Sequence, residues 1–348
     1  MAVSITGISG SSAHGNSLTI TGSGFGTKSP VAPLVWDDCS ASDVLNVWDG
    51  AWPTANATYN TNYRTVSGLG RGVARVHSRN NSRYLCGSHY GSGGPEAGYN
   101  VMAWKTVTPI FPAKYFISWW CRFDPLFDPS GGIEENHKHQ DLSGGTSAYD
   151  TNNWYISWNP GLTSFPITGW YTLRDFAGKS FWGDGTASNP ITGWRKYEWE
   201  LTIDTANGTT RYYDLASSTT AHLSFTGQDT SCTASGTPHH ISCGGFGRPY
   251  GRPDNWRYFM DLYVDATWQR VILGNASTLA ACTTREVQIP TAWTDASVTI
   301  KVNRGLFSDS ATIYLYVYDA TGQANANGFL VASGDTKPPS PPKNLRIQ

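Results

Sequence analysis

Hydrophobic and polar residues alternate with a period of two along much of this chain. In residues 115–123, every second position is Tyr, Ile, Trp, Cys or Phe, and the positions between them are Phe, Ser, Trp and Arg. Residues 153–158, 194–203 and 256–265 alternate similarly, and no stretch keeps a 3.6-residue period beyond a turn or two. Successive side chains of a β-strand point to opposite faces of the sheet, so these stretches predict strands with one face in a core. Strands of this kind predict two packed antiparallel sheets and an all-β fold.

Shorter alternating strands lie at the two ends of the chain. Residues 3–27 predict a hairpin, and residues 268–333 contain further strands at the spacing of an immunoglobulin-like sandwich. Residues 18–26, Leu-Thr-Ile-Thr-Gly-Ser-Gly-Phe-Gly, resemble the opening of TIG-type immunoglobulin-like domains. The resemblance implies one Ig-like domain made of residues 1–32 and 268–333, because the ends of a domain usually lie close together. An independent C-terminal sandwich with an N-terminal hairpin is the alternative.

Residues 33–267 would then form an inserted domain. Their pattern of amphipathic strands resembles the concanavalin A-like jelly rolls, a class of lectin, laminin-G, glycosidase and polysaccharide-lyase domains. The resemblance implies an antiparallel jelly-roll sandwich inserted in, or flanked by, the smaller Ig-like sandwich. It carries no diagnostic motif, so it implies a fold rather than an activity. Residues 334–348 are rich in Pro and predict an extended linker or tail that could join the chain to other modules.

Composition limits the classes of partner that this chain is expected to bind. Aromatic residues are 13% of the chain and the net charge is −1, so nothing indicates general attraction to nucleic acid or to an anionic membrane. No apolar run approaches the roughly 18 residues of a membrane span. The chain opens without a charged and then apolar signal segment. The chain would then be either a mature form with its signal removed or a protein released without one, as a phage structural protein would be. Because Pro-rich tails commonly join the modules of extracellular bacterial proteins, we expect an extracellular protein that is secreted, displayed on a cell surface or part of a virion.

The most informative stretch is residues 133–142, Ile-Glu-Glu-Asn-His-Lys-His-Gln-Asp-Leu, because neither side of it is apolar. With a period of two, His137, His139 and Asp141 fall on one side. Such a strand lines a wet groove, lies at an edge, or carries ligands. It follows the strand that contains Trp120 and Arg122, so we expect the two strands to be neighbours that share one groove.

The first functional hypothesis is recognition of a polysaccharide or cell-surface glycan. Sugars stack their C–H faces on aromatic rings and need planar hydrogen-bonding groups for their hydroxyls. About half of the Trp residues are expected in the core, and the rest are available for stacking. The predicted substrate-binding residues are His77, Arg79, Trp120, Arg122, Lys138 and Trp170.

Two enzymatic alternatives remain open. A lyase acting on an acidic polysaccharide needs a group that neutralises the uronate and a base that removes the C5 proton, a role that Tyr or His usually fills in jelly-roll lyases. A glycoside hydrolase would need paired carboxylates, and Glu198 and Glu200 have a suitable spacing, although Lys196 beside them favours a solvated face. The predicted catalytic residues of a lyase are Arg75, His137, His139 and Tyr155.

Other interpretations concern metals, cysteines and structural roles. His137 and His139 could bind one ion with Asp141 or with His239 and His240, but this spacing alone is a weak signal, and we predict no metal site there. No cofactor is required, although residues 124–132 could hold a structural Ca²⁺. Cys232 and Cys243 are the predicted disulfide, and Cys121 should be a buried apolar residue. A phage or cell-surface structural protein is the non-enzymatic alternative.

Overall fold

The computed structural model describes residues 2–51, 62–65, 79, 83–89, 103–106, 113–124, 136–143, 153–160, 169–174, 180–182, 194–215, 219–231, 240–243, 247–248 and 255–332. Within these residues the regular structure is β-sheet, with two single-turn 3₁₀ helices, η1 (Val44–Asn46) and η4 (Leu279–Ala281). The predicted all-β fold class is confirmed. No helix in this part of the chain has the length and apolar character needed to cross a bilayer. The predicted tail over residues 334–348 lies outside the described residues.

The chain divides into two compact units. Residues Met1–Val31 and Gln269–Gln348 form one, which we call the end unit, and Ala32–Trp268 form the other, which we call the middle unit. The end unit contains two four-stranded sheets. In chain-pairing order, these are β1 (Ser4–Gly10), β2 (Ser17–Ser23), β22 (Ser297–Lys301) and β21 (Ile289–Trp293), and β20 (Arg285–Val287), β19 (Arg270–Gly274), β23 (Ile313–Tyr318) and β24 (Phe329–Ala332).

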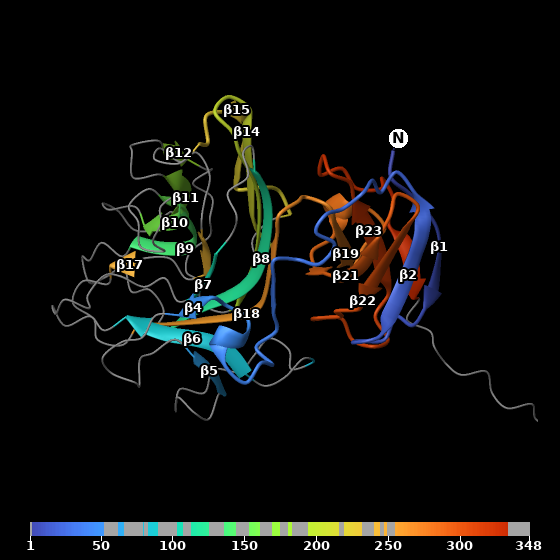
Figure 1. The fold of residues 1–348 in the computed structure, drawn as a ribbon, viewed down its shortest axis with the longest axis horizontal. Helices are drawn as coiled ribbons and strands as arrows, with labels where there is room; N and C mark the ends of the chain where they lie inside the picture. Colours follow the sequence, from blue (N-terminus) through green and yellow to red (C-terminus); the bar gives the residue numbers. More distant parts are fainter. Residues whose placement is uncertain are drawn as a thin grey trace, which may run out of the picture. The chain divides into compact units, whose positions relative to one another are not determined.

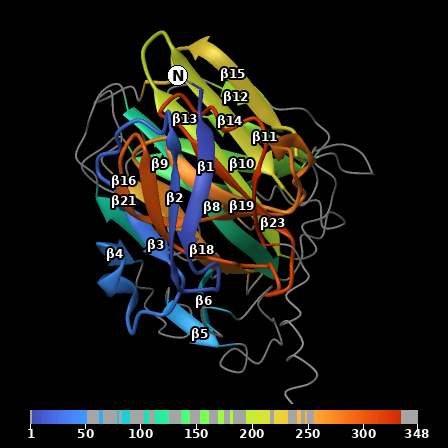
Figure 2. The same cartoon turned by 90° about the vertical axis from the view of Figure 1, so that its right-hand side faces the viewer.

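The two ends of the chain meet in the first of these sheets. Strand β2 pairs with β22, so that Ile20 lies opposite Val298 and Leu18 lies opposite Ile300. All four side chains are almost fully buried and belong to one apolar cluster of the end unit. Figure 2 shows β1 and β2 beside each other in blue. A TIG-type identity for this unit stays a prediction.

The middle unit contains two eight-stranded sheets, which we call sheet I and sheet II. They form separate layers in Figure 1. Sheet I has the order β15 (Leu223–Gln228), β14 (Gly208–Asp214), β13 (Arg195–Ile203), β8 (Ala113–Asp124), β18 (Asn255–Asp265), β6 (Arg83–His89) and β5 (Asn62–Thr65), and β3 (Val35–Asp37) pairs with β18. Sheet II has the order β12 (Ser180–Trp182), β11 (Gly169–Arg174), β10 (Asn153–Pro160), β9 (Asn136–Ser143), β16 (His240–Cys243), β7 (Ala103–Thr106) and β4 (Gly50–Ala51), and β17 (Gly247–Arg248) pairs with β9.

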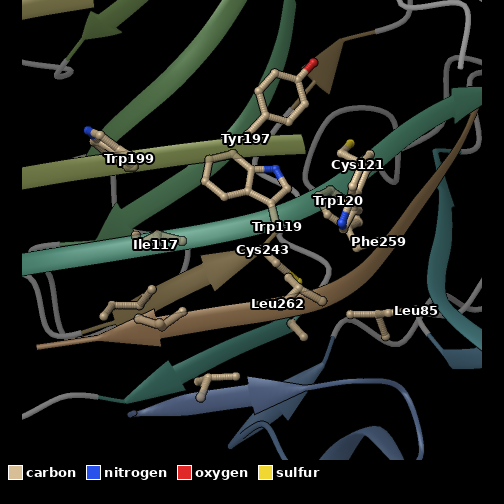
Figure 3. Close-up of a cluster of buried hydrophobic side chains, with 14 of the residues drawn as sticks. Leu85, Ile117, Trp119, Trp120, Cys121, Tyr197, Trp199, Cys243, Phe259 and Leu262 are labelled. Atoms are coloured by element: carbon tan, nitrogen blue, oxygen red, sulfur yellow. The ribbon is translucent and has the colours of Figure 1, made fainter. Parts of the chain in front are cut away.

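An aromatic core joins the two sheets (Figure 3). Trp119 of β8 stacks on Tyr197 of β13, with 5.5 Å between the ring centroids, and Tyr197 stacks in turn on Tyr212. Ile241 and Cys243 of sheet II belong to the same cluster and are fully buried. Each large aromatic ring removes on the order of 200 Å² from water, so these rings supply a large share of the burial that holds the layers together.

The cysteines of this core test two predictions. Cys121 is fully buried in the cluster, as predicted. Cys243 carries a free thiol, so the predicted Cys232–Cys243 disulfide is wrong. Burial raises the pKa of the Cys243 thiol, and the nearby Asp37 carboxyl raises it further. A protonated thiol on the core side of a strand behaves as a small apolar residue rather than a reactive one.

The buried carboxyl of Asp37 connects several segments near the start of the middle unit through hydrogen bonds. Asp37 Oδ2 accepts hydrogen bonds from Trp48 Nε1 (2.7 Å) and Tyr63 Oη (2.8 Å), and Oδ1 accepts one from the Cys39 N–H (2.8 Å). Arg83 lies over the Tyr63 ring, 5.5 Å from its centroid. Burial raises the pKa of Asp37 above its ordinary value, although the three donors lower it in part. The segments around β3, η1 and β5 are thus tied together through one acid.

This carboxyl predicts a pH-dependent stability. The folded Asp37 carboxyl keeps its proton to higher pH than the unfolded one, so its contribution is full below about pH 4 and is lost as pH rises through the raised pKa. In urea unfolding between pH 4 and pH 7, the free energy of unfolding of the wild-type protein should fall as pH rises, relative to that of the Asp37→Asn variant. A difference between the two proteins that stays constant across this range would contradict the prediction.

Candidate functional site

The polar stretch singled out in the sequence forms strand β9 in sheet II, not in sheet I. Its neighbours are β10 on one edge and β16 and β17 on the other. Strand β8 already pairs along both edges, with β13 and with β18. The prediction that β9 lies beside β8 is therefore wrong, because both hydrogen-bonding edges of β8 are occupied within sheet I.

The predicted residues on β8 are consequently not brought together with β9. Trp120 is only 7% exposed and belongs to the core cluster, with Lys196 Nζ 5.5 Å from its ring centroid. A ring that stacks on a sugar needs a free face, so Trp120 cannot serve as the predicted platform. Arg122 is half-buried and lies opposite Tyr258 in sheet I.

A β-bulge at His139 changes which residues of β9 share a face. Ile156 of β10 lies opposite Gln140, and the next residue of β10, Ser157, lies opposite Lys138. One step along β10 thus corresponds to two steps along β9, and the pairing passes over His139. An extra residue of this kind exchanges the two sides of a strand beyond it.

The bulge overturns the predicted grouping of His137 with Asp141. Asp141 lies opposite Tyr155, and Lys138 lies opposite Ser157, two residues further along β10. These positions share one face of the sheet. His137 lies opposite Trp158 and belongs to the other face. Lys138, rather than His137, accompanies Asp141.

The pairing of sheet II assembles a continuous row of residues across its strands, which we call the central row. By register it contains Gly50, Trp104, Ser242, Asp141, Tyr155, Arg174 and Ser180. Neighbouring rows on the same face contain Lys138, Ser157, Thr172 and Trp182, and Thr106, His240, Ser143 and Asn153. The pairs Asn159–Trp170 and Asn136–Arg248 extend it. We call this whole set the polar face.

The opposite face of sheet II has a different composition. The row next to the central row contains Ala103, Cys243, Gln140, Ile156, Leu173 and Phe181. Ala103 and Cys243 are fully buried in the core cluster, so this is the face that packs toward sheet I. The polar face therefore lies on the side of sheet II away from the core. It combines hydroxyl, amide and charged residues with three tryptophans and a tyrosine, and it contains no aliphatic residue.

One end of the central row is held by a close contact. Trp104 is half-buried, and a Cβ built on Gly50 would come within 2.1 Å of its ring, so only glycine fits beneath the indole. Asp49, next to this glycine, accepts hydrogen bonds from Lys105 Nζ (2.7 Å) and the Thr106 N–H (2.8 Å). Burial raises the pKa of the Asp49 carboxyl, but these bonds and the lysine charge outweigh it, and the pKa lies below its ordinary value. The strand that carries Trp104 is thereby fixed at its edge.

The remaining predicted residues divide into three groups. Tyr155, Lys138 and Trp170 belong to the polar face by register. Arg79 is described as a half-buried residue outside any strand. The predicted residues Arg75, His77 and His239, and most of the predicted Ca²⁺ loop over residues 124–132, lie outside the described residues.

The paired carboxylates proposed for a hydrolase lie elsewhere. Glu198 and Glu200 are in β13 of sheet I, and both are at most 2% exposed. Glu200 accepts a hydrogen bond from Arg211 at 2.8 Å. In the described part of the chain, no group of three or more His, Cys, Asp or Glu side chains is arranged to hold a metal ion.

The residues of the polar face that sequence reasoning missed include Trp104, Arg174, Ser242 and Arg248. Arg174 could have been found, because Trp170, Thr172 and Arg174 alternate with Tyr171 and Leu173 in one short strand. Trp104 and Ser242 lie in four-residue strands, which are too short to show an alternation. Their place in the central row depends on pairing between segments far apart in the chain.

No family model matches the chain, and no curated protein matches it. Solved structures with partial similarity include the alginate lyase vAL-1 from Chlorella virus, at 10% identity over 56% of this chain and 88% of that chain, with a TM-score of 0.32. A GH131 β-glucanase catalytic domain from Podospora anserina gives 11% identity, 66% and 95% coverage and a TM-score of 0.37. The CBM2 module of the evolved Dit of Lactobacillus casei BL23 phage J-1 has 10% identity over 67% of this chain and 94% of that chain, with a TM-score of 0.32. These TM-scores are too low to support an argument about fold or function.

The contact between Gly50 and Trp104 predicts a coupled pair of substitutions. Gly50→Ala should lower the free energy of unfolding by about 1–3 kcal/mol, because its methyl group displaces the indole. In a Trp104→Ala background the same change should have little effect. Urea unfolding of the four proteins measures the coupling. Gly7→Ala is the control, because a Cβ there meets nothing within 4 Å. Additive effects of the two substitutions would contradict the proposed contact.

Proposed function

We propose that this chain is an extracellular or virion-associated protein that binds a polysaccharide across the polar face of sheet II. The observation that carries the proposal is the central row, which joins Trp104, Tyr155 and Arg174 with hydroxyl and carboxylate residues across the sheet. Aromatic rings stack on the C–H faces of sugars, and planar polar groups bind their hydroxyls. Both types of group occur along the central row.

A face that is merely solvated would not need this composition. An antiparallel sheet can leave one face in water and then carries polar residues there, such as Thr, Lys and Ser. Trp104 adds a half-buried indole to such a face, and the register assigns Trp170 and Trp182 to the same face. Exposed aromatic rings have a cost in free energy that solubility alone does not require. A ligand that covers the rings removes this cost.

The shape of the row favours a polymer over a single sugar. With neighbouring strands about 4.8 Å apart, the step from Gly50 to Ser180 crosses six strand intervals and spans roughly 29 Å. A chain of sugars can contact several positions along such a length at once. Our proposal therefore places a linear polysaccharide across the strands, and a concanavalin A-like jelly roll would suit this arrangement.

A second candidate function is a polysaccharide lyase. The central row places Tyr155 between Asp141 and Arg174, which are the register partners on its two sides. In β-elimination a cation neutralises the uronate carboxylate, a base takes the C5 proton, and the C4–O bond breaks to leave a C4–C5 double bond, while the departing oxygen takes up a proton from an acid or from water. Arg174 and Tyr155 would fill these two roles. Arg75 and His139 remain candidates for the base or the cation, whereas His137 belongs by register to the other face of sheet II. A hydrolase at Glu198 and Glu200 is disfavoured, because both lie in sheet I and are buried.

The binding proposal is tested by retention on immobilised glycans. The chain should be retained on at least one polysaccharide of a panel of neutral and acidic polymers. Trp104→Ala should weaken that binding roughly five- to thirtyfold, which corresponds to about 1–2 kcal/mol for one stacked ring. Trp194→Ala is the matched control, because Trp194 is also partly buried but packs against Tyr84 and Tyr258 of sheet I. Failure to retain any glycan would favour a purely structural phage or cell-surface role.

The lyase proposal is tested by turnover. Incubation with polyuronates should produce the ultraviolet absorbance of an unsaturated uronate. Tyr155→Phe should then lower kcat by about 10²–10⁴ while leaving retention on the same polymer nearly unchanged, because only the proton-accepting oxygen is lost. Retention without any absorbance change would leave a binding protein. An unchanged kcat in Tyr155→Phe would show that a residue other than Tyr155 is the base.

A further inference from the structure

The polar face carries more positive than negative charge. The positions that the register assigns to it include the cations Lys138, Arg174 and Arg248 and the single carboxylate Asp141. Their sum is +3 − 1 = +2, whereas the whole chain has a net charge of −1. A face of a nearly neutral protein that collects cations attracts an anionic partner.

The three cations also lie along one line. Arg174 and Lys138 are two strands and two residues apart, and Lys138 and Arg248 are one strand and two residues apart. With the spacings of a β-sheet, these intervals are about 12 Å and about 8 Å between Cα positions. The line therefore runs diagonally over sheet II from β11 through β9 to β17. It passes the central row at Arg174.

Protection of a sheet edge does not explain Lys138 and Arg174. Lysines are common on edge strands, where they prevent pairing with other chains. Strands β9 and β11 are interior strands that pair on both sides, so Lys138 and Arg174 do not protect an edge. Surfaces that serve only solubility usually mix charges of both signs. One carboxylate among the polar-face positions cannot balance three cations.

We infer that the polysaccharide bound by the polar face is anionic and carries carboxylate or sulfate groups along its length. This inference rests on the proposed function and specifies its ligand class. The cations bind the acidic groups, while Trp104, Trp170 and Trp182 lie on the same face for stacking. Arg is suited to this role, because its planar guanidinium binds a carboxylate or sulfate through two parallel hydrogen bonds.

Matched pairs of polymers separate charge from sugar identity. Polygalacturonate is compared with its fully methyl-esterified form, alginate with its propylene glycol ester, and dextran sulfate with dextran, and single-stranded DNA is added as a non-glycan polyanion. Titrations at low and high salt measure Kd. We expect binding to a charged member, loss of binding to its neutral counterpart, and weaker binding at high salt, because screening reduces exposed charge pairs.

Substitutions that remove single charges test whether the charge dependence of binding arises from the polar face. Arg174→Gln, Lys138→Gln and Arg248→Gln should each weaken binding up to about fivefold and reduce its salt dependence. Lys301→Gln is the matched control, because Lys301 is exposed at the end of β22 in the end unit. Equal effects of the control and the three variants would overturn the inference.

Each outcome of the polymer series decides one question. Binding to a polyuronate but not to its ester supports the inference with a carboxylate ligand, and binding to dextran sulfate alone supports it with a sulfate ligand. Equal binding to charged and neutral members overturns the inference and leaves the proposed function intact. DNA that binds as tightly as the glycans overturns the assignment to polysaccharide. Retention on none of the glycans overturns both proposals.

Discussion

The packing of Trp119, Tyr197 and Tyr212 against the buried side of sheet II is the interaction on which the middle unit depends. The stacked rings of sheet I join the same cluster as Ile241 and Cys243 of sheet II. This contact commits one face of sheet II to the core. Because side chains alternate along every strand, it also commits the next residue of each strand to the outer side. The polar face is a direct consequence of the core.

A single extra residue then decides the composition of that face. Without the bulge at His139, a simple alternation would group His137 with Asp141. The bulge shifts the pairing, and Lys138 accompanies Asp141 instead. Bulges occur frequently beside functional sites, since they redirect side chains without breaking the sheet. Here the shift exchanges an imidazole for a permanent positive charge, which is one reason that an anionic ligand fits the face.

The buried polar groups around Asp37 have a different role. Trp48, Tyr63 and the Cys39 N–H all donate to one carboxyl, so the segments that contain them are held in one arrangement. A buried acid with these donors adds little net stability but specifies a unique arrangement of loops and strands. The exposed Asp49 holds the strand of Trp104 at the edge of sheet II through its hydrogen bonds to Lys105 and Thr106. The candidate site thus stands on strands whose positions are set by hydrogen bonds as well as by apolar packing.

The sequence by itself determined the all-β class and the core side of the long strands, because a period of two is a local property that no distant contact needs to supply. Cys121 was predicted as a core residue for that reason. The tertiary structure decided what depends on pairing between distant segments. It placed β8 and β9 in different sheets and Trp120 in the core. It also showed that Cys243 has a free thiol and does not form the predicted disulfide. It also brought Trp104, Ser242 and Arg174 into one row with Tyr155, since register between strands is set by hydrogen bonds across the sheet and not by the residues along one strand.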